Sequence, residues 1–148
     1  MENPAYPPHL TLVISDGPVP DGLGWTLRRD FAGSAPCRIT FDAICRFPTA
    51  PHVLWLRPDE QTQLHDLHAT ACSVVAPDRC DPLYLPAQWQ PHCTLATGVL
   101  PDREAEARRL ICAPFAPLEV LFDWIELVSL PSVDVIASVA LTAGASRK

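Results

Sequence analysis

Two short segments of the sequence repeat a histidine and a threonine at the same spacing. Residues 8–12 read Pro-His-Leu-Thr-Leu, and residues 91–95 read Pro-His-Cys-Thr-Leu. A single His-x-Thr would carry little information, but two of the five histidines lie within this wider pattern. The repetition therefore indicates one shared site, assembled from two distant parts of the chain, rather than a coincidence.

The spacing within each segment has a direct physical meaning. Residues i and i+2 of a β-strand point to the same face, so His9 and Thr11 should project together while the leucines beside them turn towards a core. His92 and Thr94 should do the same, with Cys93 and the leucine after Thr94 turned inwards. If the two strands lie close together, four polar groups surround one small pocket.

This set of groups suits a phosphodiester. A histidine side chain ordinarily exchanges its proton near neutral pH, so one neutral ring can take a proton from water while a protonated ring gives one to the departing oxygen. Threonine hydroxyls can hydrogen-bond the non-bridging oxygens and hold phosphorus in line. We therefore expect His9 and His92 to be catalytic, and Thr11 and Thr94 to bind the substrate.

Other readings of these residues stay open. A strand histidine can be an ordinary packing residue, and two histidines could ligate zinc. The residues two positions on are threonines, however, and no HExxH or CxxC motif is present, so we expect no metal and no cofactor. No GxSxG elbow or Walker loop supports a serine hydrolase or a nucleotide triphosphatase. The six cysteines are expected to be free thiols, although a thiol-dependent or metal-binding protein built on them is a further hypothesis.

Composition and charge limit the partners. The chain has 148 residues, with 11 Lys plus Arg against 17 Asp plus Glu and a net charge of −6. This length predicts a single domain over residues 1–148, and the charge predicts a small nucleotide or an RNA end rather than a long nucleic acid. No apolar run approaches about 20 residues and no signal-peptide pattern opens the chain, so no membrane partner and a cytoplasmic location are expected.

Hydrophobic periodicity predicts mixed strands and helices. The last two strands meet at a tight turn around Pro131 and should be antiparallel, which favours the α+β class. Residues 77–91 are rich in proline and read as a loop. Strands are expected at 9–14, 37–47 (with a bulge), 52–57, 92–97, 117–130 and 133–142, and helices at 21–32, 59–75 and 102–111.

The remaining histidines and two tryptophans receive structural roles. His65 and His68 lie three residues apart on the expected helix over 59–75 and should occupy its solvent-exposed flank. His52 follows a proline at the start of a strand and should lie at the surface. Trp55 and Trp124 lie inside apolar strands and are expected in the core.

The two motifs resemble those of the 2H phosphoesterase superfamily, especially its 2′-5′ RNA ligase (LigT-like) and cyclic phosphodiesterase branch. The similarity extends over residues 6–142, because the expected order of helices and strands around the motifs also matches. The resemblance implies two lobes of antiparallel sheet related by a pseudo-two-fold axis, with flanking helices and a central cleft. The family's strand and helix before the first motif are missing here, so we expect that one lobe is short by a strand, or that its edge is covered by a second subunit, as in a homodimer, or by a rearranged segment.

The resemblance also implies a function. Members open 2′,3′-cyclic phosphates to a 2′-phosphate, cut 2′-5′ linkages, or run such steps in reverse as ligation. We expect a metal-independent phosphodiesterase acting on a 2′,3′-cyclic nucleotide, a related cyclic phosphate or a 2′-5′-linked RNA end. Tyr6, Tyr84 and Trp89 flank the motifs and are candidates to stack on a base. The alternative is a non-catalytic module of the same fold that binds a phosphate or nucleotide.

Overall fold

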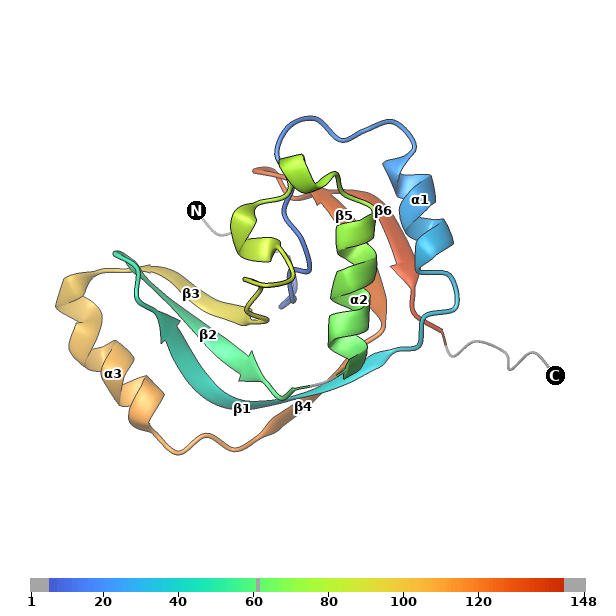
Figure 1. Ribbon diagram of the computed structural model, residues 1–148. Coiled ribbons are helices and arrows are strands. Elements are labelled where there is room, and N and C mark those ends of the chain that lie inside the picture. Colours follow the sequence, from blue (N-terminus) through green and yellow to red (C-terminus); the bar gives the residue numbers. More distant parts are fainter. Residues whose placement is uncertain (1–5, 61, 143–148) are drawn as a thin grey trace.

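The computed structural model describes residues 6–60 and 62–142 and contains two antiparallel sheets with helices packed beside them (Figure 1). The larger sheet has the order β3-β2-β1-β4, and the smaller pairs β5 with β6. This arrangement confirms a two-lobed α+β fold. The strands are β1 (Cys37–Phe47), β2 (His52–Pro58), β3 (Cys93–Val99), β4 (Leu118–Phe122), β5 (Trp124–Ser129) and β6 (Asp134–Ala140), and the helices are α1 (Leu23–Asp30), α2 (Thr62–Ser73) and α3 (Glu104–Cys112).

The long strand β1 organises the larger sheet. Its buried residues Cys37, Ile39 and Phe41 alternate with less buried neighbours, which is the period of a strand with one face on the core. The register with β2 shifts by one residue between Phe41 and Ala43, so the strand contains the expected bulge, slightly earlier than the break in the sequence pattern suggested. A bulge increases local bending, and the sheet curls in Figure 1.

The expected single strand over 117–130 is in fact two strands in different sheets. β4 pairs with β1 and β5 pairs with β6, and the break falls at Asp123. The carbonyl of Asp123 accepts a hydrogen bond of 2.7 Å from the backbone N–H of Leu141. One apolar stretch thus serves both lobes, which periodicity along the sequence cannot reveal.

The first motif does not lie on a regular strand, which corrects the expectation for residues 9–14. The segment is extended, but its pairing is limited to an isolated bridge between Ser15 and Cys80. The backbone N–H of Asp81 donates to the carbonyl of Ile14 at 2.8 Å, and that of Asp16 donates to the carbonyl of Arg79 at 2.9 Å. The partner is therefore an irregular loop, which cannot continue a ladder of strand hydrogen bonds.

The helices form where the periodicity indicated. Two glycines weaken the pattern for α1, and the structure accounts for both of them. Gly22 has φ +77° immediately before the first turn, a conformation that glycine adopts at little cost. A Cβ on Gly24 would lie 3.2 Å from the Cβ of Ala137, so glycine lets α1 pack closely on β6.

The core lies between the sheets and the helices. Phe31, Cys37, Ile39 and Phe41 are fully buried, and Leu64, Leu67 and Ala71 of α2 pack in the same cluster. The cluster also takes in Leu27, Leu56, Trp89, Cys93, Ala137 and Leu141. Residues far apart in the sequence therefore share one core.

The two tryptophans expected in the core differ. Trp55 is buried, as expected, but Trp124 is 58% exposed. Its neighbour Ile125 packs against the core, and successive residues of a strand face opposite sides, so Trp124 must point outwards. Of the helices in the described ranges, none has the length and apolar character to cross a membrane.

Candidate active site

His9 of the first motif is exposed, and the residues around it tie its segment to the core. The ring nitrogen Nδ1 of His9 lies 3.0 Å from the carbonyl oxygen of Pro7. Leu10 and Leu12 are partly buried against the core cluster, as the His-x-Thr spacing predicts. The indole N–H of Trp89 donates to the backbone carbonyl of Thr11 at 3.2 Å.

The second motif enters β3. His92 is half-buried immediately before the strand, Cys93 is buried, and Thr94 is exposed. Thr94 lies opposite Trp55 of β2. The expectation that Leu95 turns inwards is wrong, because it is 47% exposed. The register with β2 shifts at this point, with Leu95 as the extra residue of a bulge.

Both motif histidines make the same hydrogen bond. His92 Nδ1 lies 2.7 Å from the carbonyl oxygen of Gln90, just as His9 Nδ1 contacts the carbonyl of Pro7, and each acceptor is two residues before its histidine. A carbonyl oxygen can only accept, so Nδ1 carries a proton in both rings. In the neutral ring, Nε2 is then the nitrogen left with a lone pair, and it can exchange a proton with a ligand.

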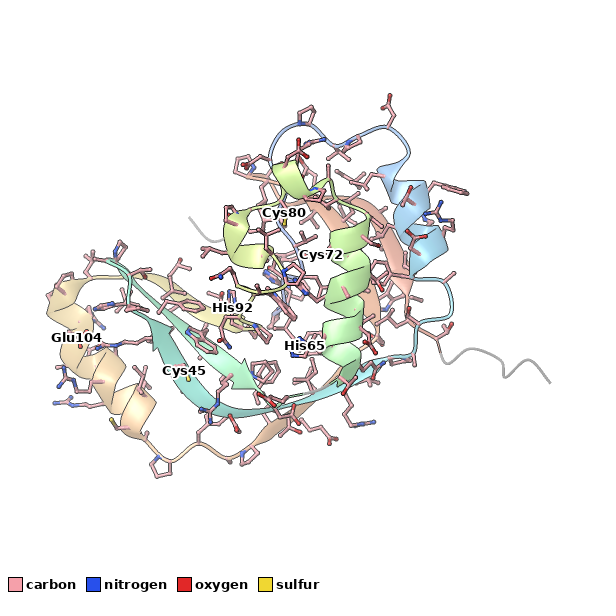
Figure 2. All side chains as sticks on the ribbon, in the orientation of Figure 1. Cys45, His65, Cys72, Cys80, His92 and Glu104 are labelled. Atoms are coloured by element: carbon pink, nitrogen blue, oxygen red, sulfur yellow. The ribbon has the colours of Figure 1, made fainter. Side chains whose placement is uncertain are left out.

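The two motifs meet at Cys93. Burial raises the pKa of the Cys93 thiol, and a hydrogen bond with the backbone of His9 acts in the opposite direction. The middle residue of the second motif therefore contacts the first residue of the other motif, although 84 positions separate them (93 − 9). Figure 2 shows His92 in the central part of the molecule, beside the loop that precedes β3.

The three aromatic residues proposed to stack on a base all contact the first motif. The Tyr6 ring packs edge-on against His9, with ring centroids 4.8 Å apart. The Tyr84 side chain, whose pKa is raised mainly by burial, hydrogen-bonds Thr11. Trp89 is only 8% exposed and stacks on His68 with centroids 3.9 Å apart. Trp89 is therefore a core residue, without a free face for a base.

A second aromatic group, which no sequence pattern links to the motifs, packs around His92. Phe47 stacks on Trp55 with centroids 4.9 Å apart, and His92 lies edge-on to both, 5.0 Å from Phe47 and 6.1 Å from Trp55. The indole Nε1 of Trp55 is buried and has no hydrogen-bond partner among the described residues. The strand pairing that creates this group is not encoded in any local motif.

The expectation for the two helix histidines is half correct. His65 is exposed and lies edge-on to Trp89. His68 is 3% exposed, not on the exposed flank, because its ring fills the space between α2 and Trp89. Its Nε2 donates to the carbonyl of Tyr84 at 2.9 Å, and burial is the main reason that its pKa is lowered.

His52 is not the plain surface residue that was expected. It is half-buried, with Nε2 3.1 Å from a carboxylate oxygen of Glu104. Glu104 also pairs with Arg46 at 2.5 Å and Arg108 at 3.2 Å, and these hydrogen bonds hold its pKa below the usual range. This cluster joins α3 to the larger sheet and includes none of the motif residues.

Metal-ligating residues do not gather at any place in the described part of the chain. Within residues 6–60 and 62–142, no group of three or more His, Cys, Asp or Glu is arranged to hold a metal ion. The six cysteines all lie within the described residues and form no disulfide; Cys37 and Cys93 are buried and Cys112 is exposed. Two surface hollows flank α3, and neither is lined by a motif residue.

Two antiparallel sheets and a pair of His-x-Thr segments are the features that the resemblance to 2H phosphoesterases implied. Comparison with known families agrees with this resemblance. The family model of the 2′-5′ RNA ligase superfamily matches residues 3–133. The chain therefore belongs to this superfamily, as the resemblance to 2H phosphoesterases implied, and membership supports a phosphoesterase-type function in general. No curated protein and no solved structure gives a significant match.

Proposed function

We propose that the chain is a metal-independent phosphodiesterase that acts on a 2′,3′-cyclic nucleotide, a related cyclic phosphate or a 2′-5′-linked RNA end. The observation that carries the proposal is the matched hydrogen bond from Nδ1 of His9 and of His92 to the carbonyl two residues earlier. It presents Nε2 of each ring as the proton-exchanging atom. Together with the family match, this pairing favours general acid–base chemistry by two imidazoles.

The reaction on a 2′,3′-cyclic phosphate can be written with these groups alone. Water attacks phosphorus, and a neutral imidazole takes its proton through Nε2. The bond from phosphorus to O3′ breaks, and the imidazolium of the other motif gives its proton to O3′. The products are a 2′-phosphate and a free 3′-hydroxyl. Thr11 and Thr94 donate hydrogen bonds to the non-bridging oxygens and stabilise the charge that develops there.

The charge of the protein supports a small substrate. With a net charge of −6, long polynucleotides would be repelled beyond the immediate site. Four arginines, two near the ends of β1 and two in α3 or immediately before it, are already paired with carboxylates: Arg38, Arg46, Arg103 and Arg108. A mononucleotide or one RNA end is therefore the proposed ligand, and Tyr84, beside the first motif, is proposed to line its binding site.

The test is turnover of a 2′,3′-cyclic nucleotide in the presence of EDTA. His9→Ala and His92→Ala should each lower kcat by at least about 100-fold, the usual range for loss of a general acid or base. His52→Ala, which removes a histidine outside both motifs, is the matched control and should retain activity. Loss of turnover in EDTA, or either motif variant at wild-type activity, contradicts the mechanism. Nucleotide binding by calorimetry without turnover of any cyclic or 2′-5′ substrate favours the non-catalytic module instead.

A further inference from the structure

We infer that Tyr6 and Glu126 form a positioning pair that holds the His9 imidazole in its working orientation. The inference rests on the proposed function, because it assigns a role within the same site. Tyr6 is here a positioning residue, which acts through His9 and is not itself a proton donor or acceptor in the reaction. Glu126 anchors Tyr6.

The contacts form a short chain from the strand to the histidine. The Tyr6 hydroxyl donates to Oε2 of Glu126 at 3.1 Å. The Tyr6 ring then packs edge-on against His9, at 4.8 Å between centroids and 63° between planes. His9 is also held by the hydrogen bond from its Nδ1 to the Pro7 carbonyl at 3.0 Å. One ring contact and one hydrogen bond together limit rotation of the imidazole.

The bond to Glu126 matters because the segment that carries His9 has no regular secondary structure of its own. The segment over 9–14 has no ladder of strand hydrogen bonds, and His9 itself is exposed. Glu126 lies in β5, which is paired with β6 over its whole length, and it is 120 residues from Tyr6. The hydroxyl of Tyr6 thus connects an irregular segment to a rigid element of the fold.

The chemistry of the pair keeps it intact at ordinary pH. Burial raises the pKa of the Tyr6 hydroxyl, and the hydrogen bond and charge of Glu126 raise it further. The phenol therefore stays protonated and remains a donor to Glu126. A hydrogen bond to a charged group is stronger than one between neutral groups, which suits a contact that is partly open to water.

The other motif histidine is held differently. His92 lies immediately before β3 and packs against Phe47 and Trp55, two residues of paired strands. Besides its hydrogen bond to the Pro7 carbonyl, the His9 ring packs against Tyr6, which is anchored by one bond to the Glu126 carboxylate. Removing a single hydroxyl should therefore disturb His9 and leave His92 in place.

The decisive variants separate the ring from the hydroxyl. Tyr6→Leu removes both, and kcat should fall roughly tenfold with little change in KM, because misplacing a general acid or base costs rate rather than binding. Tyr6→Phe and Glu126→Ala should each give a smaller fall of about threefold. Glu126→Gln keeps an acceptor and should retain activity. Glu119→Ala, which removes an exposed carboxylate paired with Arg38 on β1, is the matched control.

A double variant tests whether the two residues act together. Since Tyr6→Phe and Glu126→Ala break the same bond, the double variant should be no less active than either single variant. Additive losses overturn the pair. Unchanged kcat in Tyr6→Leu overturns the positioning role altogether.

A measurement without substrate distinguishes this inference from the proposed function. In ¹⁵N spectra of the histidine rings, His9 should show a proton on Nδ1 in the wild type and a more even mixture of tautomers in Tyr6→Leu, while His92 is unchanged. If this shift occurs but the wild type turns over no substrate, the pair stands and the proposed function fails. If the tautomer of His9 is the same in Tyr6→Leu, the pair is overturned whatever the activity.

Discussion

Thr94 of the second motif lies directly opposite Trp55 across the antiparallel pair of β3 and β2. Paired residues of antiparallel strands project to the same face, and His92 lies edge-on to Trp55. The sheet thus presents the histidine, the threonine and the tryptophan on one face. The second motif is built on a regular scaffold, whereas the first is held by side chains from elsewhere in the fold.

Phe47 should orient His92 from this scaffold. Phe47→Leu keeps apolar volume but removes the stacking on Trp55 and the edge contact with His92, which are worth about 1 kcal/mol each. We expect kcat to fall roughly threefold to tenfold and the midpoint of thermal unfolding to drop by a few degrees. Steady-state kinetics and thermal denaturation measure the two effects. Trp25→Leu is the control, because this tryptophan of α1 is 64% exposed and lies beneath the Arg29 guanidinium, 5.0 Å from its ring centroid. Equal kinetic losses in both variants would contradict the role of Phe47.

The two threonines should contribute through their hydroxyls. Thr11→Val and Thr94→Val conserve shape and remove the donor, and a hydrogen bond to a charged group is worth about 1.5–3 kcal/mol. Each variant should lose roughly 10- to 100-fold in kcat/KM for a 2′,3′-cyclic nucleotide. Serine at either position keeps the hydroxyl, so the Thr→Ser variants should retain most of the wild-type kcat/KM. If valine and serine variants behave alike, the hydroxyls do not contact the phosphate.

Buried His68 should make stability depend on pH. Its pKa is lowered from 6.5 in the folded state, chiefly by burial, so the unfolded chain binds more protons between the folded pKa and about pH 6.5. The free energy of unfolding should therefore be at its full value above pH 6.5 and should decrease as the pH falls through the folded pKa. His68→Gln, which can still donate to the Tyr84 carbonyl, should show a shallower decrease. Urea unfolding at pH 5 and pH 7.5 measures the difference, and identical pH dependence in both proteins would contradict it.

The thiols should differ in reactivity. Burial raises the pKa of Cys37 and of Cys93, and it also shields both sulfurs, whereas Cys112 is exposed. Only a thiolate attacks a disulfide reagent, so Cys112 should react first with Ellman's reagent. Cys37 and Cys93 should react only after unfolding. Cys112→Ser should remove the fast phase, and a fast phase of unchanged size in this variant would show that another thiol is more accessible.

The strongest predictions from sequence concerned elements with a clear local period. The helix α2, the strands β1 and β2, and the antiparallel pair β5–β6 were all expected from apolar spacing and turn residues. The inward direction of Leu10, Leu12 and Cys93 also followed from the period of two. These features are set by neighbours within a few residues, which periodicity can detect.

Predictions failed where a distant partner decided the outcome. The segment over 9–14 has the composition of a strand but lies beside a loop, so no ladder forms. His68 occupies a helical position that could have faced solvent, but Trp89 covers it. Trp124 has a strand neighbour that faces the core, and the pairing of β5 with β6 turns its own side chain outwards.

The two His-x-Thr motifs, the α+β class and the superfamily could all be recognised from the sequence, because they depend on residue types and short spacings. The side chains that hold each histidine are known only from the folded chain: Tyr6 and Glu126 for His9, and Phe47 and Trp55 for His92. These contacts join residues up to 120 positions apart. They arise from strand register and from core packing, which bring such residues together without leaving a local pattern in the chain.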